Sequence, residues 1–392
     1  MRVGLLATTA LALVAPCTAY AQTSTPPIAT GPAASQDAAS ADATPPAAAA
    51  GPTDELGDII VTAQRRAENL QRAAVAVNVV QGSDLVNSGL TQPARLGELV
   101  PALTIQPSST GNLIFLRGVG NFTLTPNSDP AIAFNYDSVY VGRPSSTNGL
   151  FFDLDRIEVL KGPQGTLYGR NATGGAINVL PTQPKLGELS GYGSVSYGNY
   201  NAVIAEGAIN VPLGDEGAMR VSASTSRHDG YLSDRLFDDD TTSLRVQMKA
   251  ALTPKLTVRT AFDYEQTRGS GFGGAYVSNY NFFPPTQSYR TILSGLPLSD
   301  GIYSADSQAY RTTVNAGPAG RKLDTIAPTP FQHNDFYGAN AQIDYDTGDG
   351  VLTIIPAWRY ANQDYLSEAA GFPYRNREKD EQFSVEARFA GT

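Results

Sequence analysis

Apolar and polar side chains alternate with a period of two along much of the second half of the chain. In residues 243–252, Leu, Val, Met and Ala alternate with Ser, Arg, Gln and Lys. Because successive side chains of a strand point to opposite faces of its sheet, this alternation predicts strands with one apolar and one polar face. Roughly eight such strands are predicted after Pro184, each about 9–11 residues long, as in a tilted membrane strand. They are residues 190–198, 202–211, 218–228, 243–252, 256–265, 336–346, 351–361 and 380–389.

The links between these strands alternate in length. Short turns are predicted at 212–217, 253–255 and 347–350, and longer polar loops at 229–241, 267–333 and 362–379. Short turns on one side and long loops on the other are expected of an outer-membrane barrel. A secreted β-sandwich also alternates. Tyrosines near the segment ends, among them Tyr192, Tyr264 and Tyr360, favour the barrel because aromatic girdles mark membrane interfaces.

Residues 64–183 show short mixed runs, which predict one compact α+β unit. Strands are expected within residues 75–80, 114–116, 133–141, 157–160 and 176–180. A short helix is expected to start at Gln81–Asp84 with Ser83 as its N-cap, and a second helical turn to cover residues 93–99.

Eight strands form a barrel that their own side chains fill. Such a barrel cannot enclose a separate unit of this size, so either the unit lies outside or further strands are missing. The sequence also stops shortly after an apparent strand. We therefore expect residues 184–392 to be the N-terminal part of a larger barrel, in a truncated sequence.

The N-terminus has the pattern of a secretion signal. Arg2 precedes a short apolar run at residues 5–14, and Ala19-Tyr20-Ala21 supplies a small-x-small cleavage pattern. Residues 1–21 are therefore predicted to be a signal peptide, with the mature chain starting near Gln22. Residues 22–57 are rich in Ala, Pro, Thr and Ser and predict a disordered periplasmic linker.

Charge and residue usage narrow the function. The formal net charge of −9 argues against a nucleic-acid partner. Cys17 is the only cysteine and lies in the predicted signal peptide, so we expect no disulfide and no thiolate metal site. His228 and His333 are isolated loop candidates rather than metal ligands. With no catalytic constellation in the sequence, we expect neither an enzyme nor a cofactor.

Three motifs identify a family resemblance. Residues 58–63 read Asp-Ile-Ile-Val-Thr-Ala, residues 115–118 read Phe-Leu-Arg-Gly, and residues 155–179 read Asp-Arg-Ile-Glu-Val-Leu-Lys-Gly-Pro-Gln-Gly-Thr-Leu-Tyr-Gly-Arg-Asn-Ala-Thr-Gly-Gly-Ala-Ile-Asn-Val. In this order they resemble the TonB box and plug domain of TonB-dependent outer-membrane receptors. The resemblance covers residues 58–183. Lys161 stands where that family usually has arginine, and residues 135–142 vary its usual Asp-Gly-Val segment.

The resemblance implies a plug inside a barrel of about 22 strands, located in the outer membrane of a Gram-negative bacterium. It implies import of a scarce large nutrient, such as a ferric siderophore, a vitamin or an oligosaccharide. The energy would come from the periplasmic protein TonB, which would bind the segment made of Asp58, Ile59, Ile60, Val61, Thr62 and Ala63. We call residues 58–63 the coupling segment. From the residues alone, it is either a strand for a partner's sheet or simply the first plug strand.

The resemblance also marks residues of the plug and the barrel wall. The plug positions are Arg117, Gly118, Glu158, Lys161, Gly162, Pro163, Gly169, Gly174 and Gly175. A phosphate loop is excluded because no Gly-Lys-Ser/Thr follows at the required spacing, so the glycines are interpreted as turn formers. In the wall, alternation directs Phe383 and Val385 to lipid and directs Glu386 and Arg388 to the lumen. We expect Glu386 to pair with Arg117 or Lys161.

Two other function classes fit less well. An open diffusion porin would be occluded by the plug, and a secreted enzyme lacks acid–base residues. The cargo cannot be identified from the sequence. The 267–333 loop carries Tyr276, Tyr280, Phe282, Phe283 and Tyr289. These aromatics either stack on a ligand or pack on one another.

Overall fold

The computed structural model describes residues 60–62, 65, 68–88, 93–108, 111–121, 128–143, 147, 151–283, 288–315, 330–369 and 372–391. The predicted signal peptide, the linker, and Asp58, Ile59 and Ala63 of the coupling segment lie outside these residues. Among the described residues, no helix has both the length and the apolar character needed to cross a membrane.

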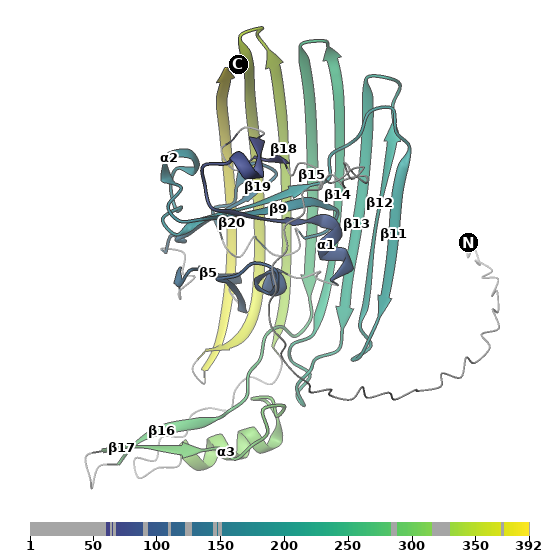
Figure 1. Ribbon diagram of the computed structural model, residues 1–392. Helices are drawn as coiled ribbons and strands as arrows, with labels where there is room; N and C mark the ends of the chain where they lie inside the picture. The colour runs from purple at the N-terminus through teal and green to yellow at the C-terminus, as the bar shows by residue number, and fades with distance from the viewer. Residues whose placement is uncertain are drawn as a thin grey trace, which may run out of the picture. The chain divides into compact units, whose positions relative to one another are not determined.

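Eight antiparallel strands form one sheet in which the strands follow each other in chain order, and a separate hairpin lies in the link between the fifth and the sixth (Figure 1). We call it the wall sheet. Its strands are β11 (Ser190–Tyr197), β12 (Val203–Pro212), β13 (Gly217–His228), β14 (Asp239–Thr253), β15 (Leu256–Arg268), β18 (Phe331–Asp346), β19 (Gly350–Ala369) and β20 (Phe372–Gly391). All eight predicted strands are confirmed, and the fold is the expected partial barrel.

The predicted loop at 362–379 is wrong. Strands β19 and β20 are each 20 residues long and pair continuously from Gly350 opposite Gly391 to Ala369 opposite Phe372. The polar residues there are cross-strand partners: Asp364 accepts hydrogen bonds from Arg375 at 2.9 Å and from Arg377 at 3.1 Å. Polarity therefore marks the part of the hairpin exposed to water, and pairing continues beyond the apolar band.

The long 267–333 link contains elements that the alternation did not predict. They are the hairpin β16 (Ser278–Phe283) with β17 (Ser288–Leu293), and helix α3 (Ala305–Asn315). The 229–238 loop is tied to this link by backbone hydrogen bonds, including Ser233 to Ser299 and Phe237 to Gly271. The long loops therefore support one another.

The unit at residues 60–181 is the α+β plug. Its main sheet has the order β3 (Val77–Gln81), β9 (Leu154–Lys161), β10 (Gly175–Pro181), β7 (Ile132–Tyr136) and β8 (Val139–Tyr140). A smaller sheet comprises β4 (Leu103–Ser108), β5 (Gly111–Leu116) and β6 (Val119–Gly120). Strands β1 (Ile60–Val61) and β2 (Glu68–Asn69) form a two-stranded pair. The helical segments are η1 (Leu70–Arg72), α1 (Gly82–Asn87), η2 (Pro93–Glu98) and α2 (Gly165–Tyr168).

Strands β3, β5, β9 and β10 match predicted runs, whereas the single run predicted at 133–141 is two strands, β7 and β8, joined by a turn. The predicted helix cap is wrong. Gln81, not Ser83, is the N-cap of α1, and Asp84 accepts a hydrogen bond from its backbone nitrogen at 3.3 Å. A side chain three residues into the helix that reaches back to the cap satisfies an otherwise free donor. Strand β4 was not predicted.

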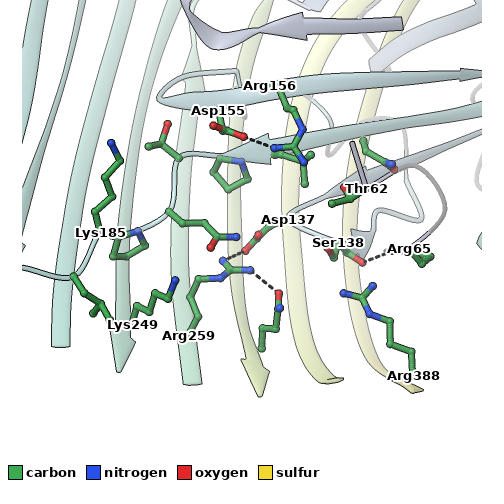
Figure 2. Close-up of a pocket in the computed structure, with 18 of the residues that line it drawn as sticks. Thr62, Arg65, Asp137, Ser138, Asp155, Arg156, Lys185, Lys249, Arg259 and Arg388 are labelled. Carbon is green, nitrogen blue, oxygen red and sulfur yellow. Dashed lines mark hydrogen bonds and ion pairs between the residues drawn. The ribbon is translucent and has the colours of Figure 1, made fainter. Parts of the chain in front are cut away.

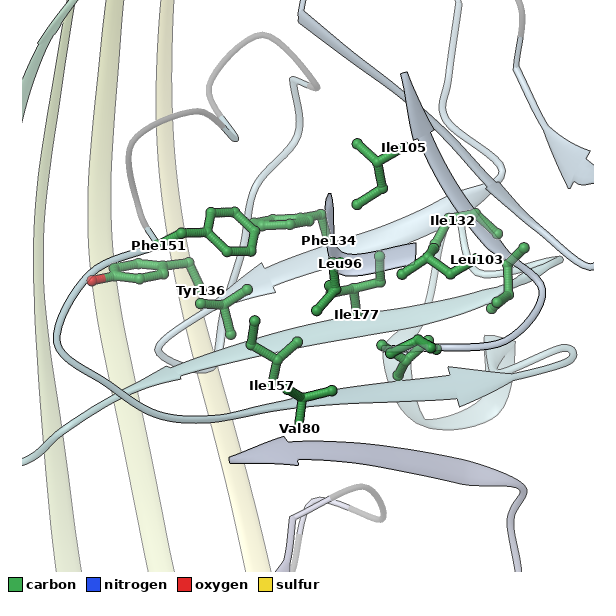
Figure 3. Packing of buried hydrophobic residues seen from close by; sticks show 14 of the residues in the cluster. Val80, Leu96, Leu103, Ile105, Ile132, Phe134, Tyr136, Phe151, Ile157 and Ile177 are labelled. Carbon is green, nitrogen blue, oxygen red and sulfur yellow. The ribbon is translucent and has the colours of Figure 1, made fainter. Parts of the chain in front are cut away.

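The main sheet packs its apolar side chains into one core with the smaller sheet and η2 (Figure 3). Its fully buried members include Val100, Leu116, Ile157, Val159, Ile177 and Val179. Full burial of each such side chain stabilises the fold by about 1.5–3 kcal/mol. The plug therefore has an ordinary apolar interior of its own.

The wall sheet has the opposite arrangement. Along β14, Arg245 and Gln247 are buried against the plug, whereas Leu244 and Met248 are 38% and 48% exposed. On β20, Phe383 and Val385 are 74% and 72% exposed. The apolar face of the wall sheet points away from the plug, as lipid contact requires.

Candidate functional site

The described part of the coupling segment is docked on the plug. Ile60 pairs with Asn69 and Val61 with Glu68 in the β1–β2 ladder. Val61 is fully buried with Leu160, Tyr168 and neighbouring residues, while Ile60 is 47% exposed. Of the two interpretations left open by the sequence, the structure has the first-strand arrangement. Partner binding by the same residues remains a prediction.

Glu158 anchors the end of the coupling segment. Its side chain is fully buried in β9 and accepts a 2.7 Å hydrogen bond from the backbone nitrogen of Thr62. Arg156 donates to the same carboxylate at 2.9 Å, and Asn178 at 3.4 Å. A buried carboxylate needs such donors, because leaving its charge unpaired in the interior is costly. Loss of Thr62 from this network therefore has an energetic cost inside the plug.

Arg65 links the same region to the wall. Its guanidinium lies 4.5 Å from the centre of the Tyr168 ring, and one nitrogen lies 3.6 Å from Glu386 on β20. Burial raises the pKa of the Tyr168 hydroxyl, so the ring beneath Arg65 stays neutral. Arg388 lies 3.3 Å from the other oxygen of Glu386. Sequence reasoning missed Arg65, which carries no motif of its own.

The expected pairing of Glu386 with Arg117 or Lys161 is wrong. Arg117 is exposed in the turn after β5, and Lys161 ends β9 with its backbone nitrogen bonded to Ala76. The sequence places Glu386 correctly on the inner face, but it does not determine which plug cation lies opposite β20. That choice depends on how the plug sits against the wall.

The motif glycines shape the chain between β9 and β10. Gly162 has φ +96°, a value that L residues rarely adopt. A Cβ atom on Gly174 would lie 2.5 Å from Ile132 Cδ1, so a side chain there would collide with the core. Gly118, Gly169 and Gly175 also have positive φ, and Pro163 is exposed. These positions form turns and close contacts, as expected of turn formers.

Two buried ion pairs join the plug to the wall. Asp153 of the plug accepts a hydrogen bond from Arg220 Nε of β13 at 2.8 Å. Asp137, in the turn after β7, accepts from Arg259 of β15 at 2.6 Å and from Asn340 of β18 at 2.9 Å. All four charged side chains are at most 7% exposed. Removing one partner of such a pair would leave the other charge buried and unpaired, which is costly. These contacts therefore hold the plug in place.

Arg245 of β14 makes a third contact with the plug. It donates to the backbone oxygen of Phe152 at 2.9 Å. Its guanidinium lies 4.2 Å from the centre of the Phe152 ring and 5.0 Å from that of Tyr136. The period-two pattern alone could have indicated such residues, because an inward-facing arginine on a membrane strand needs a partner in the lumen.

A cavity of about 520 Å³ lies on the side of the short turns, between the plug and the wall sheet (Figure 2). The plug contributes Thr62, Arg65, Asp137 and Arg156, and the wall contributes Lys249 and Arg259. Most of its charged side chains are cationic. The lining of this cavity thus includes the end of the coupling segment together with residues of the plug and of the wall sheet.

A second cavity of about 230 Å³ lies on the side of the long loops. Its aromatic residues are Phe151 and Phe152 of the plug, with Tyr231, Phe237 and Phe272 of the loops. Asp238, Asp239, Glu265 and Arg268 add ionisable groups to it. Aromatic rings with a few charged groups suit an organic ligand, and a volume below the usual range of about 300–1,000 Å³ for small-molecule sites accommodates only part of a large one.

Of the loop aromatics singled out in the sequence, Tyr276 has a described side chain, and it does not line this second cavity. Tyr276 lies 6.0 Å from Tyr310, centre to centre, which is packing within the loop. Tyr280, Phe282, Phe283 and Tyr289 are on β16 and β17, and their side chains are outside the described set. His228 does line the cavity and stacks on Tyr231 at 4.6 Å. Among the described residues, no group of three or more His, Cys, Asp or Glu side chains could hold a metal ion.

Comparison with known proteins gives one family. Residues 69–176 match the family model described as "TonB-dependent Receptor Plug Domain". Over 133 residues the chain is 36% identical to the pesticin receptor of Yersinia pestis, covering 32% of this chain and 19% of that protein. Over 281 residues it is 27% identical to the catecholate siderophore receptor Fiu of Escherichia coli O157:H7, covering 67% of this chain and 30% of that protein.

Solved structures share the fold. The ferric yersiniabactin uptake receptor FyuA from Yersinia pestis superposes with a TM-score of 0.63 at 20% identity, covering 81% of this chain and 46% of FyuA. The ferripyoverdine receptor of Pseudomonas aeruginosa gives 0.58 at 14% identity, covering 86% and 42%. At these identities the likeness concerns the fold alone. The chain thus spans less than half the length of each of these four relatives.

Proposed function

The chain belongs to the family of TonB-dependent receptors, and on that premise we propose that it imports an iron chelate across the outer membrane of a Gram-negative bacterium. Relatives named as receptors for ferric yersiniabactin, for catecholate siderophores and for ferripyoverdine support an iron chelate as the cargo. An oligosaccharide or a vitamin remains the alternative cargo class. The cavity with aromatic residues beside the long loops is the proposed entry site.

The observation that carries this proposal is the docking of the coupling segment. Its residues Val61 and Thr62 are bound to the plug, and Arg65 just beyond them is bound to the wall. A periplasmic protein that captures residues 58–63 as an added strand would therefore pull on both contacts. In our proposal TonB is that partner.

The contacts at the coupling segment are few enough to be broken by a pull. The β1–β2 pair comprises two residues on each strand. The hydrogen bond from Thr62 to the Glu158 carboxylate contributes about 1.5–3 kcal/mol, as is usual for a charged acceptor. The Arg65–Glu386 pair is partly exposed and contributes less, about 1 kcal/mol at most. Release of the segment therefore costs a few kcal/mol, while the buried pairs at Asp137 and Asp153 still hold the plug.

The ion pairs between the plug and the wall argue against a passive porin. The buried pairs Asp153–Arg220 and Asp137–Arg259 fix the plug against the wall. An open pore would require these to break spontaneously, at a cost of several kcal/mol each. An external source of energy is therefore part of the proposal. We expect transport rather than catalysis.

The direct test is a deletion. The full-length protein lacking residues 58–63 is expressed in a receptor-deficient Gram-negative strain, and uptake of radioactive iron chelates is measured with and without a protonophore. A matched control deletes residues 45–50 of the linker. We expect the first deletion to abolish concentrative uptake and the second to leave it intact. Uptake that persists without residues 58–63 would overturn the proposal.

A further inference from the structure

The cavity beside the short turns carries more positive charge than the fold requires. Its lining has six cationic and two acidic side chains, in a chain with a formal net charge of −9. The cations are Arg65, Arg156, Lys185, Lys249, Arg259 and Arg388. In Figure 2, Arg156 approaches from the plug, and Lys249, Arg259 and Arg388 approach from the wall strands. Like charges gathered around one space repel each other, and an anion in that space would relieve the repulsion.

The two acidic residues of the lining are already engaged. Asp137 accepts the hydrogen bond from Arg259 at 2.6 Å. Asp155 forms an ion pair with Arg156. Each acid therefore neutralises one cation at the edge of the cavity, and neither is free to balance the others.

The acid nearest to the remaining arginines is shared. Glu386 lies 3.6 Å from Arg65 and 3.3 Å from Arg388. One carboxylate cannot neutralise two guanidinium groups. Lys185 lies 3.7 Å from Glu188, and both of these side chains are largely exposed to solvent. Arg156 also donates to the buried Glu158 at 2.9 Å. The six cations of the lining thus have five acidic partners, which leaves one positive charge; these partners are Asp137, Asp155, Glu158, Glu188 and Glu386.

Lys249 is the residue whose charge has no internal explanation. It lies directly opposite Arg259 in the register of β14 and β15. Both side chains line the cavity, and like charges directly opposite each other destabilise a strand pair. Among the residues that the structure describes, no acidic side chain forms an ion pair with Lys249. A charged side chain that lowers stability and makes no ion pair within the fold is a candidate for binding a ligand.

We propose that this cavity is a transient site for an anionic cargo, an iron chelate of net negative charge, on the periplasmic side of the plug, with Lys249 as a principal contact. The inference rests on the proposed import function and narrows its substrate class. The volume of about 520 Å³ suits a ligand of that size, because small-molecule sites are about 300–1,000 Å³. Because the cavity also contains Thr62 and Arg65, release of the coupling segment would change its lining and let the anion leave.

The first experiment measures the site without knowledge of the cargo. The purified full-length protein is titrated with inorganic pyrophosphate by calorimetry at low salt, in comparison with Lys249→Gln. The matched control is Lys255→Gln, which removes the same charge from the exposed β14–β15 turn outside the cavity. We expect Lys249→Gln to bind pyrophosphate about tenfold more weakly, the equivalent of about 1.4 kcal/mol, and Lys255→Gln to match the wild type. Equal affinity in all three proteins, or equal weakening by both substitutions, would overturn the inference.

The second experiment tests the cargo class. Uptake of a trianionic tris-catecholate iron chelate and of a neutral tris-hydroxamate iron chelate is compared in cells expressing wild type and Lys249→Gln at equal surface levels. We expect the variant to slow uptake of the anionic chelate only. If the wild type imports the anionic chelate and the variant does so equally fast, the inference fails while the import proposal stands. If the wild type shows no energy-dependent uptake of either chelate, the import proposal fails, and the pyrophosphate titration still decides whether the cavity binds anions.

Discussion

The plug and the wall sheet use apolar residues in opposite ways. In the plug, Ile157 and Ile177 are fully buried between the two sheets and η2. In the wall, Val385 and Phe383 are more than 70% exposed, while Arg245 and Gln247 on the other face are buried. The difference lies in the surroundings of each part. The plug excludes water from its apolar interior, whereas the wall sheet presents its apolar face to lipid and its polar face to the plug.

This contrast explains where the plug is held. Arginines on the inner face of the wall contact acids and aromatic rings at the edge of the plug, as in Asp153–Arg220 and Asp137–Arg259. The apolar core takes part at this edge through Tyr136, whose ring lies 5.0 Å from the Arg245 guanidinium.

The largest effect is expected from a substitution in the plug core. Ile157→Ala removes buried methyl groups and leaves a cavity, so we expect a loss of about 2–5 kcal/mol in the free energy of plug unfolding. Val385→Ala makes a similar truncation on the exposed face of the wall and should change stability by less than about 0.5 kcal/mol. Denaturant unfolding of the full-length protein in detergent measures both. Equal losses would show that the two apolar faces have the same surroundings.

A charge introduced on the outer face of the wall sheet tests whether that face contacts lipid. Phe262 on β15 is 42% exposed and points away from the plug. In a bilayer, Phe262→Arg should cost about 2–4 kcal/mol near mid-depth. Thr253→Arg, at the turn end of β14, should cost about 0–1 kcal/mol because water is near. Refolding equilibria in liposomes give both values, and a small cost for Phe262→Arg would argue against lipid on that face.

A smaller effect is expected at the link between plug and wall. Arg65→Gln removes the ion pair with Glu386, whose side chains are 16% and 35% exposed, so solvent screening limits its contribution to about 1 kcal/mol. The coupling segment should then open more often, and a thiol at Val61→Cys, which is fully buried while the segment is docked, should react about fivefold faster. Arg95→Gln, which disrupts a salt bridge with Glu98 on η2, is the matched control. An unchanged labelling rate in Arg65→Gln would show that Arg65 does not hold the coupling segment on the plug.

The period-two pattern was sufficient to predict the wall sheet, because lipid on one face and a polar lumen on the other impose alternation on every strand. It failed at 362–379, where hydrophilic residues were interpreted as a loop although Asp364 and Arg375 pair across the hairpin. It also missed β4, a six-residue strand that contains Pro107. In each case the tertiary partner, not the local sequence, decided the structure.

The site was predictable only in part. The motif resemblance located Glu158 and the coupling segment, and alternation placed Glu386 on the inner face. Neither could identify Arg65 as the partner of Glu386, nor pair Asp153 with Arg220, because these contacts join residues far apart in the chain. Such pairs follow from the orientation of the plug against the wall, which no local pattern encodes.

We propose that β1 must leave β2 before cargo can pass. A reversible disulfide between Ile60→Cys and Asn69→Cys, which face each other in the ladder, would hold β1 in place. Within residues 1–392 the only cysteine is Cys17, in the predicted signal peptide, so no other thiol of this part of the chain competes with the introduced pair. A control pair, Thr225→Cys with Thr242→Cys, bridges β13 and β14 in the wall instead. The account predicts that uptake of an iron chelate stops when the first pair is oxidised and resumes on reduction, with no effect from the second. Undiminished uptake through the oxidised Ile60→Cys/Asn69→Cys protein would contradict it.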